Sequence, residues 1–144
     1  MKKTVLFLCT HNSARSQMAE GLLRFYHSDE FDVESAGVVS THIKEQAVKA
    51  MNELGIDMSG DRSKSIEEFR SRMFDYVVTV CDSAKEACPF FPGRKTLHQA
   101  FEDPSEVQGT QDDKMDAFRR SRDEIRNWLE NEFMITMKEK TERD

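Results

Sequence analysis

Apolar and polar positions along the chain follow a pattern typical of repeated strand and helix units. Short apolar runs at Val5–Leu8 and Tyr76–Val80 are typical of parallel strands that are covered on both faces. Between them, apolar and acidic residues alternate over Phe31–Gly37, which predicts a second strand at an edge of the sheet. Lys95–His98 indicates a brief fourth strand. The chain is therefore expected to form a four-stranded sheet.

Apolar residues at helical spacing fill the segments between these runs. Ser16–Tyr26 carries one such stripe, and a second covers 47–54 and stops at Gly55, a common helix-ending residue. Ser65–Glu68 has the form of a capping box and predicts a short helix. Thr110 is placed to cap a long final helix with an apolar face.

This order of elements predicts an α/β fold: a single-domain, flavodoxin-like, four-stranded parallel sheet with helices on both faces. No linker or repeat divides the chain, so one domain is expected over 1–137, followed by a charged tail at 138–144 that frays. In such sheets, ligands bind beyond the carboxyl ends of the strands, where the strand order reverses. Cys9 and Cys81 both stand at such ends.

Composition and charge narrow the class of protein. The chain has 144 residues, enough to bury a core, and a net charge of −6 without a basic cluster, which argues against a nucleic-acid partner. The longest apolar run is too short to span a membrane or to act as a signal peptide, so a cytoplasmic protein is expected. In that reducing compartment, the three cysteines are expected to be reactive, metal-bound or buried rather than structural disulfides.

The loop after the first strand is the strongest candidate site. Between strand and helix, its backbone N–H groups can point inward at one anion, next to the positive end of the helix dipole. Arg15 can bind two oxygens of that anion as a planar fork, and the same field favours Cys9 as a nucleophilic thiolate. A hydroxyl from Ser13 or Ser16 can donate to the sulfur. The expected oxyanion-binding residues are Thr10, His11, Asn12, Ser13, Ala14, Arg15 and Ser16. The alternative is a buried cysteine with an arginine nearby by chance.

The stretch CTHNSARSQMAEG resembles the C-x5-R-S loop of low-molecular-weight protein tyrosine phosphatases, and more closely that of thioredoxin-coupled arsenate reductases with the same fold. The resemblance extends to SAG at 35–37, VVTVC at 77–81 and EDP at 102–104. Family loops usually read CTGNSCRS, so His11 replaces a glycine and Ala14 replaces a cysteine. The resemblance implies that Asp103 is the general acid, although Asp-Pro is also a common turn pair.

Cys81 and Cys88 separate the two branches of this family, because a phosphatase needs neither. Reduction of arsenate takes two electrons, which two thiols supply as they form a disulfide. The resemblance implies a relay in which Cys9 attacks arsenate, Cys81 attacks Cys9, Cys88 attacks Cys81, and thioredoxin reduces the final disulfide. A helix between Cys81 and Cys88 would hold their α-carbons about 10 Å apart, too far for a bridge, so residues 82–87 must then unwind. Alternatively, Cys81 is a small buried residue and Cys88 caps a helix; a zinc site is the weaker option.

Lys64 raises the question of a bound cation. Some reductases of this branch bind potassium beside the loop through Asn, Glu, Ser and Asp, and the first three fall on Asn12, Glu20 and Ser35. The aspartate position falls on Lys64, whose ammonium can take the cation's place. The four are therefore expected to support the loop, with no metal or other cofactor and no need for potassium. In the alternative, Lys64 points into solvent.

The resemblance thus implies an arsenate reductase that serves arsenic detoxification, with arsenate as substrate and thioredoxin as electron donor. Its catalytic residues would be Cys9, Arg15, Cys81, Cys88 and Asp103. We expect a monomer. Two other functions stay open at this point: a tyrosine phosphatase that uses the same loop, and a non-catalytic redox sensor that uses the Cys81–Cys88 pair as a switch.

Overall fold

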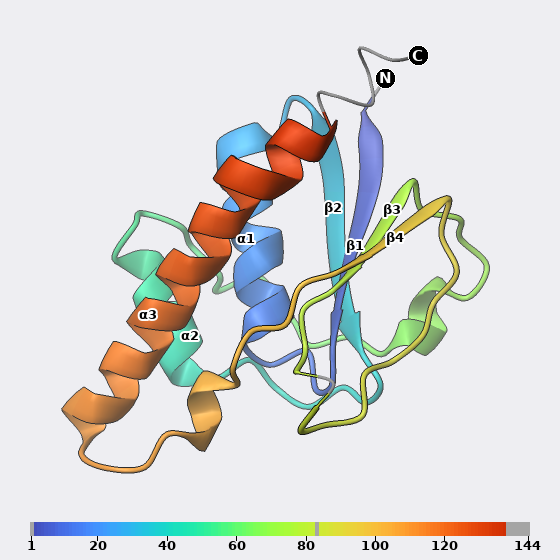
Figure 1. Cartoon of the computed structure of the whole chain (residues 1–144). Helices are drawn as coiled ribbons and strands as arrows, with labels where there is room; N and C mark the ends of the chain where they lie inside the picture. Colours follow the sequence, from blue (N-terminus) through green and yellow to red (C-terminus); the bar gives the residue numbers. More distant parts are fainter. Residues whose placement is uncertain (1, 83, 138–144) are drawn as a thin grey trace.

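A computed structural model describes residues 2–82 and 84–137. Its sheet has the order β2-β1-β3-β4, and each adjacent pair of strands is parallel (Figure 1). The strands are β1 (Lys3–Cys9), β2 (Phe31–Gly37), β3 (Tyr76–Thr79) and β4 (Lys95–His98). The predicted parallel sheet is confirmed, and β2 lies at an edge as expected.

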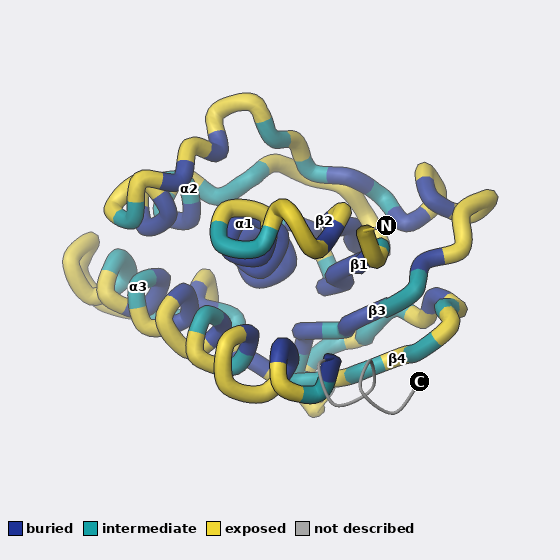
Figure 2. The backbone as a smooth tube through the Cα atoms, turned by 90° about the horizontal axis from the view of Figure 1, so that it is seen from above, coloured by how far each residue is buried: buried dark blue, intermediate teal, exposed yellow. Residues whose placement is uncertain are grey.

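Three α-helices cover one face of this sheet (Figure 1). They are α1 (Arg15–His27), α2 (Glu45–Asn52) and α3 (Gln111–Trp128), and α3 runs on through a π-helical turn, η3 (Leu129–Phe133). Seen from above, α1 lies between the other two helices and the sheet, and it is the most buried of the three (Figure 2). Thr110 caps α3 in a capping box with Asp113, as its sequence position predicts.

The opposite face of the sheet is covered by the short 3₁₀ helix η1 (Ile66–Phe69) and the loops near it. Ser65 and Glu68 form the predicted capping box at its start. The aromatic residues Phe69 and Phe74 pack there with the strand residues Leu6, Leu8 and Val77. Within the described residues, helical turns therefore lie on both faces, but the second face carries a single short turn and is closed mainly by aromatic side chains.

The strand ends bring the cysteine-bearing segments together. β1 ends at Cys9, and just beyond the end of β3 the Val80 N–H donates to the Leu8 carbonyl at 2.9 Å. β1 and β3 are neighbours although β2 lies between them in the sequence, so the strand order reverses here. Cys9 and Cys81 both belong to the core on the α-helical side. The site therefore forms at the switch in strand order.

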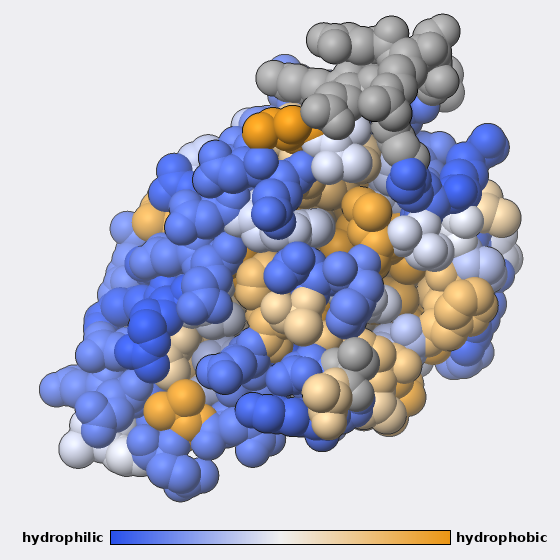
Figure 3. Space-filling model, in the orientation of Figure 1, coloured by the Kyte–Doolittle hydropathy of each residue, from blue (hydrophilic) through white to orange (hydrophobic). Residues whose placement is uncertain are grey.

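The surface over α3 is largely hydrophilic (Figure 3), as expected of a helix with one buried stripe. In the part of the chain that the structure describes, no helix is both long and apolar enough to cross a membrane. A 3₁₀ turn that the apolar pattern did not predict, η2 (Pro104–Glu106), precedes α3. The predicted tail at 138–144 lies outside the described residues.

Candidate active site

The loop between β1 and α1 is held by Asn12. Its φ of 52° lies in the left-handed region, and its side chain is fully buried. The Asn12 amide donates to Ser16 Oγ at 2.8 Å and to Ser35 Oγ at 2.9 Å, while its oxygen accepts the backbone N–H of Lys64 at 2.8 Å. Asn tolerates this backbone region because its short polar side chain can bond locally. The strained position is thus Asn12 and not His11, so the family's glycine is not required at 11.

Gly37, at the end of β2, lets the loop approach the sheet closely. A Cβ at this position would lie 2.7 Å from both the backbone nitrogen of Asn12 and the carbonyl oxygen of Thr10. No larger residue fits without displacing the loop backbone. Gly37, the last residue of the SAG triplet, therefore shapes the loop after β1 from a neighbouring strand.

The Cys9 sulfur lies in this loop, 2.7 Å from Ser16 Oγ, and the residue is 2 % exposed. Ser16 Oγ already accepts a hydrogen bond from the Asn12 amide. A serine hydroxyl carries a single proton, so that proton is available to the sulfur. Of the two hydroxyls considered from the sequence, that of Ser16 contacts the Cys9 sulfur.

The Arg15 guanidinium is buried at the mouth of the loop and forms a bidentate pair with Glu86. Arg15 Nη1 lies 2.6 Å from Glu86 Oε2, and Nη2 lies 2.8 Å from Oε1. Nη1 also donates to the Phe101 carbonyl at 3.1 Å. Burial favours the neutral guanidinium, but the Glu86 carboxylate and the nearby Cys9 sulfur outweigh it and raise the pKa of Arg15. The sequence analysis did not identify Glu86.

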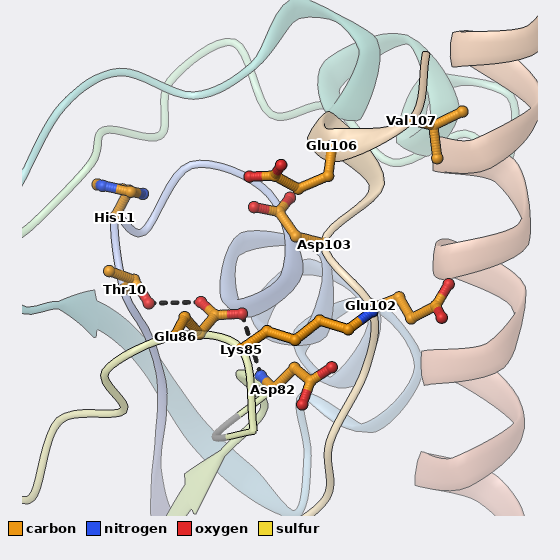
Figure 4. Close-up of a pocket in the computed structure, with 9 residues that line it drawn as sticks. All are labelled: Thr10, His11, Asp82, Lys85, Glu86, Glu102, Asp103, Glu106 and Val107. Atoms are coloured by element: carbon orange, nitrogen blue, oxygen red, sulfur yellow. Dashed lines mark hydrogen bonds between the residues drawn. The ribbon is translucent and has the colours of Figure 1, made fainter.

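Asp103 faces the same site from the loop before α3. Its Oδ2 lies 3.6 Å from Arg15 Nη2. Its Oδ1 accepts both the backbone N–H and the hydroxyl of Ser105, at 3.0 and 2.6 Å. Ser105 thus orients the carboxylate. Figure 4 shows the pocket that Asp103 and Glu86 share, lined by Thr10, His11, Asp82, Lys85, Glu86, Glu102, Asp103, Glu106 and Val107.

Behind the loop, the expected supporting residues form one buried cluster. Ser35 Oγ donates to Glu20 Oε1 at 2.6 Å, and Lys64 Nζ lies 3.2 Å from the same oxygen. Arg24 Nη1 binds the other Glu20 oxygen at 2.7 Å. The Lys64 side chain is 11 % exposed, so it points inward and not into solvent. An ammonium therefore occupies the interior next to Asn12, Glu20 and Ser35.

Cys81 and Cys88 form a disulfide, with their α-carbons 5.9 Å apart. No helix separates them in the described residues around the bridge, which agrees with the expectation that a helical 82–87 could not allow it. Cys81 is fully buried and Cys88 is partly exposed. Of the three cysteines in the sequence, Cys9 alone is a free thiol.

Residues 4–143 match the family of low molecular weight phosphotyrosine protein phosphatases. The chain belongs to this family. Within it, the chain is 47 % identical over 125 residues to the arsenate reductase of Halalkalibacterium halodurans, which covers 86 % of this chain and 90 % of that protein.

Two solved structures extend the comparison. An arsenate reductase in the phosphate-binding state is 31 % identical, with a TM-score of 0.76 over 90 % of this chain and 95 % of the other. A thioredoxin-dependent arsenate reductase of Corynebacterium glutamicum is 27 % identical, with a TM-score of 0.65 over 90 % of this chain and 61 % of the other. Both structures are therefore similar to this chain over nearly the whole length of this chain.

Proposed function

We propose that this protein reduces arsenate to arsenite through a relay of Cys9, Cys81 and Cys88, and that thioredoxin returns the enzyme to its reduced state. The observation that carries the proposal is the Cys81–Cys88 disulfide next to the loop that holds Cys9 and Arg15. A phosphatase mechanism has no use for that bond. The similarity to arsenate reductases supports the same reaction.

In the first step, the Cys9 thiolate attacks the arsenic atom. A sulfur–arsenic bond forms and an arsenic–oxygen bond breaks, with a proton from Asp103 so that the oxygen leaves as water. Arg15 and the backbone N–H groups expected to line the loop hold the remaining oxygens. The Ser16 hydroxyl, 2.7 Å from the sulfur, stabilises the thiolate before attack.

The second step carries the electrons. The Cys81 thiolate attacks the Cys9 sulfur, the sulfur–arsenic bond breaks, and its electron pair stays with arsenic, which leaves as arsenite. Cys88 then attacks Cys81 and frees Cys9 as a thiolate. This last exchange would produce a Cys81–Cys88 bond, and the disulfide between these two residues supports the step.

Thioredoxin, as a small dithiol protein, would resolve that product. Cys88 is partly exposed and Cys81 is fully buried. We therefore assign Cys88 as the sulfur that the donor attacks, since access decides which sulfur of a disulfide reacts. Two electrons pass from the donor's thiols to the bridge, and both enzyme cysteines become thiols again. The chemistry requires a compartment that keeps thiols reduced, so we place the protein in the cytoplasm. We also propose that it acts as a monomer, since all three cysteines of the relay belong to one chain.

The direct test is a coupled assay with the purified full chain, thioredoxin, thioredoxin reductase and NADPH. We expect NADPH oxidation that depends on arsenate and on thioredoxin together, with one arsenite formed for each NADPH consumed. Omission of arsenate is the matched control. If arsenate drew no NADPH oxidation while an aryl phosphate was hydrolysed, the protein would be a phosphatase.

Hydrolysis of phosphomonoesters is the second candidate activity, because Cys9, Arg15 and Asp103 meet at one site and are sufficient for it. We expect a residual activity of this kind alongside arsenate reduction. It uses the same nucleophile and general acid but neither Cys81 nor Cys88.

A further prediction concerns potassium. Because the Lys64 ammonium lies 3.2 Å from Glu20 Oε1, we expect turnover to be the same in sodium and in potassium buffers. The Lys64→Asp variant would place a carboxylate there, and we expect its turnover to rise when potassium replaces sodium. Steady-state arsenate reduction in matched chloride salts measures both. A several-fold rise for the natural chain on this exchange would rule out the assigned role of Lys64.

A further inference from the structure

The Glu86 carboxylate sits where an oxyanion substrate would be expected to bind Arg15. Both of its oxygens accept from the guanidinium. Oε1 also accepts the Thr10 hydroxyl at 2.5 Å, and Oε2 accepts the Asp82 N–H at 3.1 Å (Figure 4). Four hydrogen bonds thus converge on one side chain of which 19 % is exposed. Its negative charge and its two oxygens on a planar fork match two oxygens of arsenate or phosphate.

We propose that Glu86 is an internal competitor that keeps the oxyanion site closed while the Cys81–Cys88 disulfide is intact. The inference rests on the proposed function, in which this disulfide ends each cycle. Glu86 and a substrate oxyanion compete for Arg15, because both terminal nitrogens of Arg15 already donate to Glu86 and cannot bind a second pair of oxygens in the same geometry. Substrate can bind only after the carboxylate leaves.

The disulfide explains why the competitor is effective. Glu86 lies two residues before Cys88, and the bridge fixes the Cys88 α-carbon 5.9 Å from that of Cys81. The adjoining Ala87 carbonyl accepts a second, longer bond from the Thr10 hydroxyl, at 3.3 Å. A carboxylate on so short a covalent tether acts at an effective concentration of about millimolar or more. Reduction leaves Glu86 attached to the chain but releases the bridge that fixes the segment before Cys88, so the carboxylate is no longer held in the geometry that faces Arg15.

The contact does not depend on pH in the neutral range. Partial burial opposes ionisation, but hydrogen bonds from Arg15 and Thr10 lower the pKa of Glu86 from 4.5 to about 2. Because the pKa of Glu86 is lowered when it binds Arg15, the contact stabilises the closed site fully above about pH 4.5. It is lost only as the pH falls from there towards 2. At neutral pH, the state of the disulfide, and not the protonation of Glu86, therefore controls access to the oxyanion site.

A closed site would order the catalytic cycle. After the bridge forms, Cys9 is again a free thiol. If a second arsenate bound then, Cys9 would attack it while Cys81 and Cys88 were still oxidised, and the adduct would have no thiol to resolve it. Glu86 prevents this by holding Arg15 until the donor has reduced the bridge. The same linkage requires bound oxyanion to favour the reduced state.

The test is a calorimetric titration of inorganic phosphate into the full chain, with the disulfide either intact or reduced. We expect the oxidised natural chain to bind phosphate at least about tenfold more weakly than the reduced chain, since only the open fraction can bind. In Glu86→Gln, which keeps the shape but removes the charge, the two dissociation constants should agree within about twofold.

Glu106→Gln is the matched control. Glu106 lines the same pocket, whereas the groups that bind Arg15 in the described part of the chain belong to Glu86, Phe101 and Asp103. This variant removes the same charge without touching the pair, so it should keep the difference between oxidised and reduced forms. Equal binding by both forms of the natural chain would overturn the inference. So would a difference that survives in Glu86→Gln, or one that Glu106→Gln abolishes.

A second readout follows from the linkage. If phosphate binds the reduced chain tenfold more tightly, saturating phosphate must raise the midpoint potential of the Cys81–Cys88 couple by about 30 mV. The potential of Glu86→Gln should not move. Neither measurement uses turnover, so their failure would leave the arsenate reductase proposal intact. Conversely, loss of that proposal would leave a measurable redox-gated anion site.

Discussion

Replacement of Cys88 by serine is expected to stop arsenate reduction after a single turnover. Cys9 and Cys81 suffice to release one arsenite, but the Cys9–Cys81 disulfide then has no neighbouring thiolate to resolve it. Cys81 is fully buried and Cys9 is 2 % exposed, so an external dithiol has poor access to that bond. Hydrolysis of an aryl phosphate should be nearly unchanged in the reduced variant, because it needs no second thiol.

The measurement compares arsenite released per enzyme with aryl phosphate hydrolysis under the same conditions. Mass mapping after arsenate addition should find Cys9 joined to Cys81. Ala87→Ser is the matched control, since it adds a hydroxyl to the neighbouring exposed position and leaves all three thiols in place. Sustained thioredoxin-dependent turnover by Cys88→Ser would contradict the relay. Absence of both activities in the natural chain would instead support a redox sensor.

Replacement of Arg15 by lysine is expected to lower kcat/KM about a thousandfold for both arsenate reduction and aryl phosphate hydrolysis. Lysine keeps the positive charge but cannot bind two oxygens in one plane. The two short contacts from Arg15 to Glu86, at 2.6 and 2.8 Å, show that the natural side chain is placed for such bidentate binding.

Steady-state kinetics with each substrate measure this loss. Arg120→Lys, at an exposed position on α3, makes the same exchange away from the site and should leave kcat/KM unchanged. Equal falls in the two activities would show that one oxyanion site serves both. A change smaller than about tenfold would mean that charge alone is sufficient, and that the planar fork contributes little.

The two reactions share a nucleophile, so the position of the additional thiols decides between them. In the proposed function, the loop from Cys9 to Arg15 would bind a tetrahedral oxyanion in either case. What makes reduction possible is a buried Cys81 beside Cys9, followed by a Cys88 that reaches the surface. Once arsenite has left, the oxidising equivalent can therefore move from the buried Cys9–Cys81 bond to an accessible sulfur.

Much of this protein follows from local sequence. The apolar run in β1, the alternation in β2 and the capping residues Ser65 and Thr110 act over a few neighbouring residues, and the structure has each element where these signals predict it. The loop motif was equally visible, since Cys9 and Arg15 lie on one short segment between a strand and a helix. The sequence also indicated a role for Lys64, because a lysine stands where the resemblance places an aspartate.

Only the tertiary structure decided which distant groups meet. Glu86 binds Arg15 across 71 positions of sequence, and Lys64 binds Glu20 across 44. No periodicity or capping rule relates such pairs, because their contact depends on strand order, loop closure and, for Glu86, a covalent bridge. Charged surface loops carry many glutamates, and only folding selects the one whose carboxylate is held against a buried guanidinium. Local interactions therefore specified the elements and the nucleophile's loop, whereas chain topology determined what surrounds them.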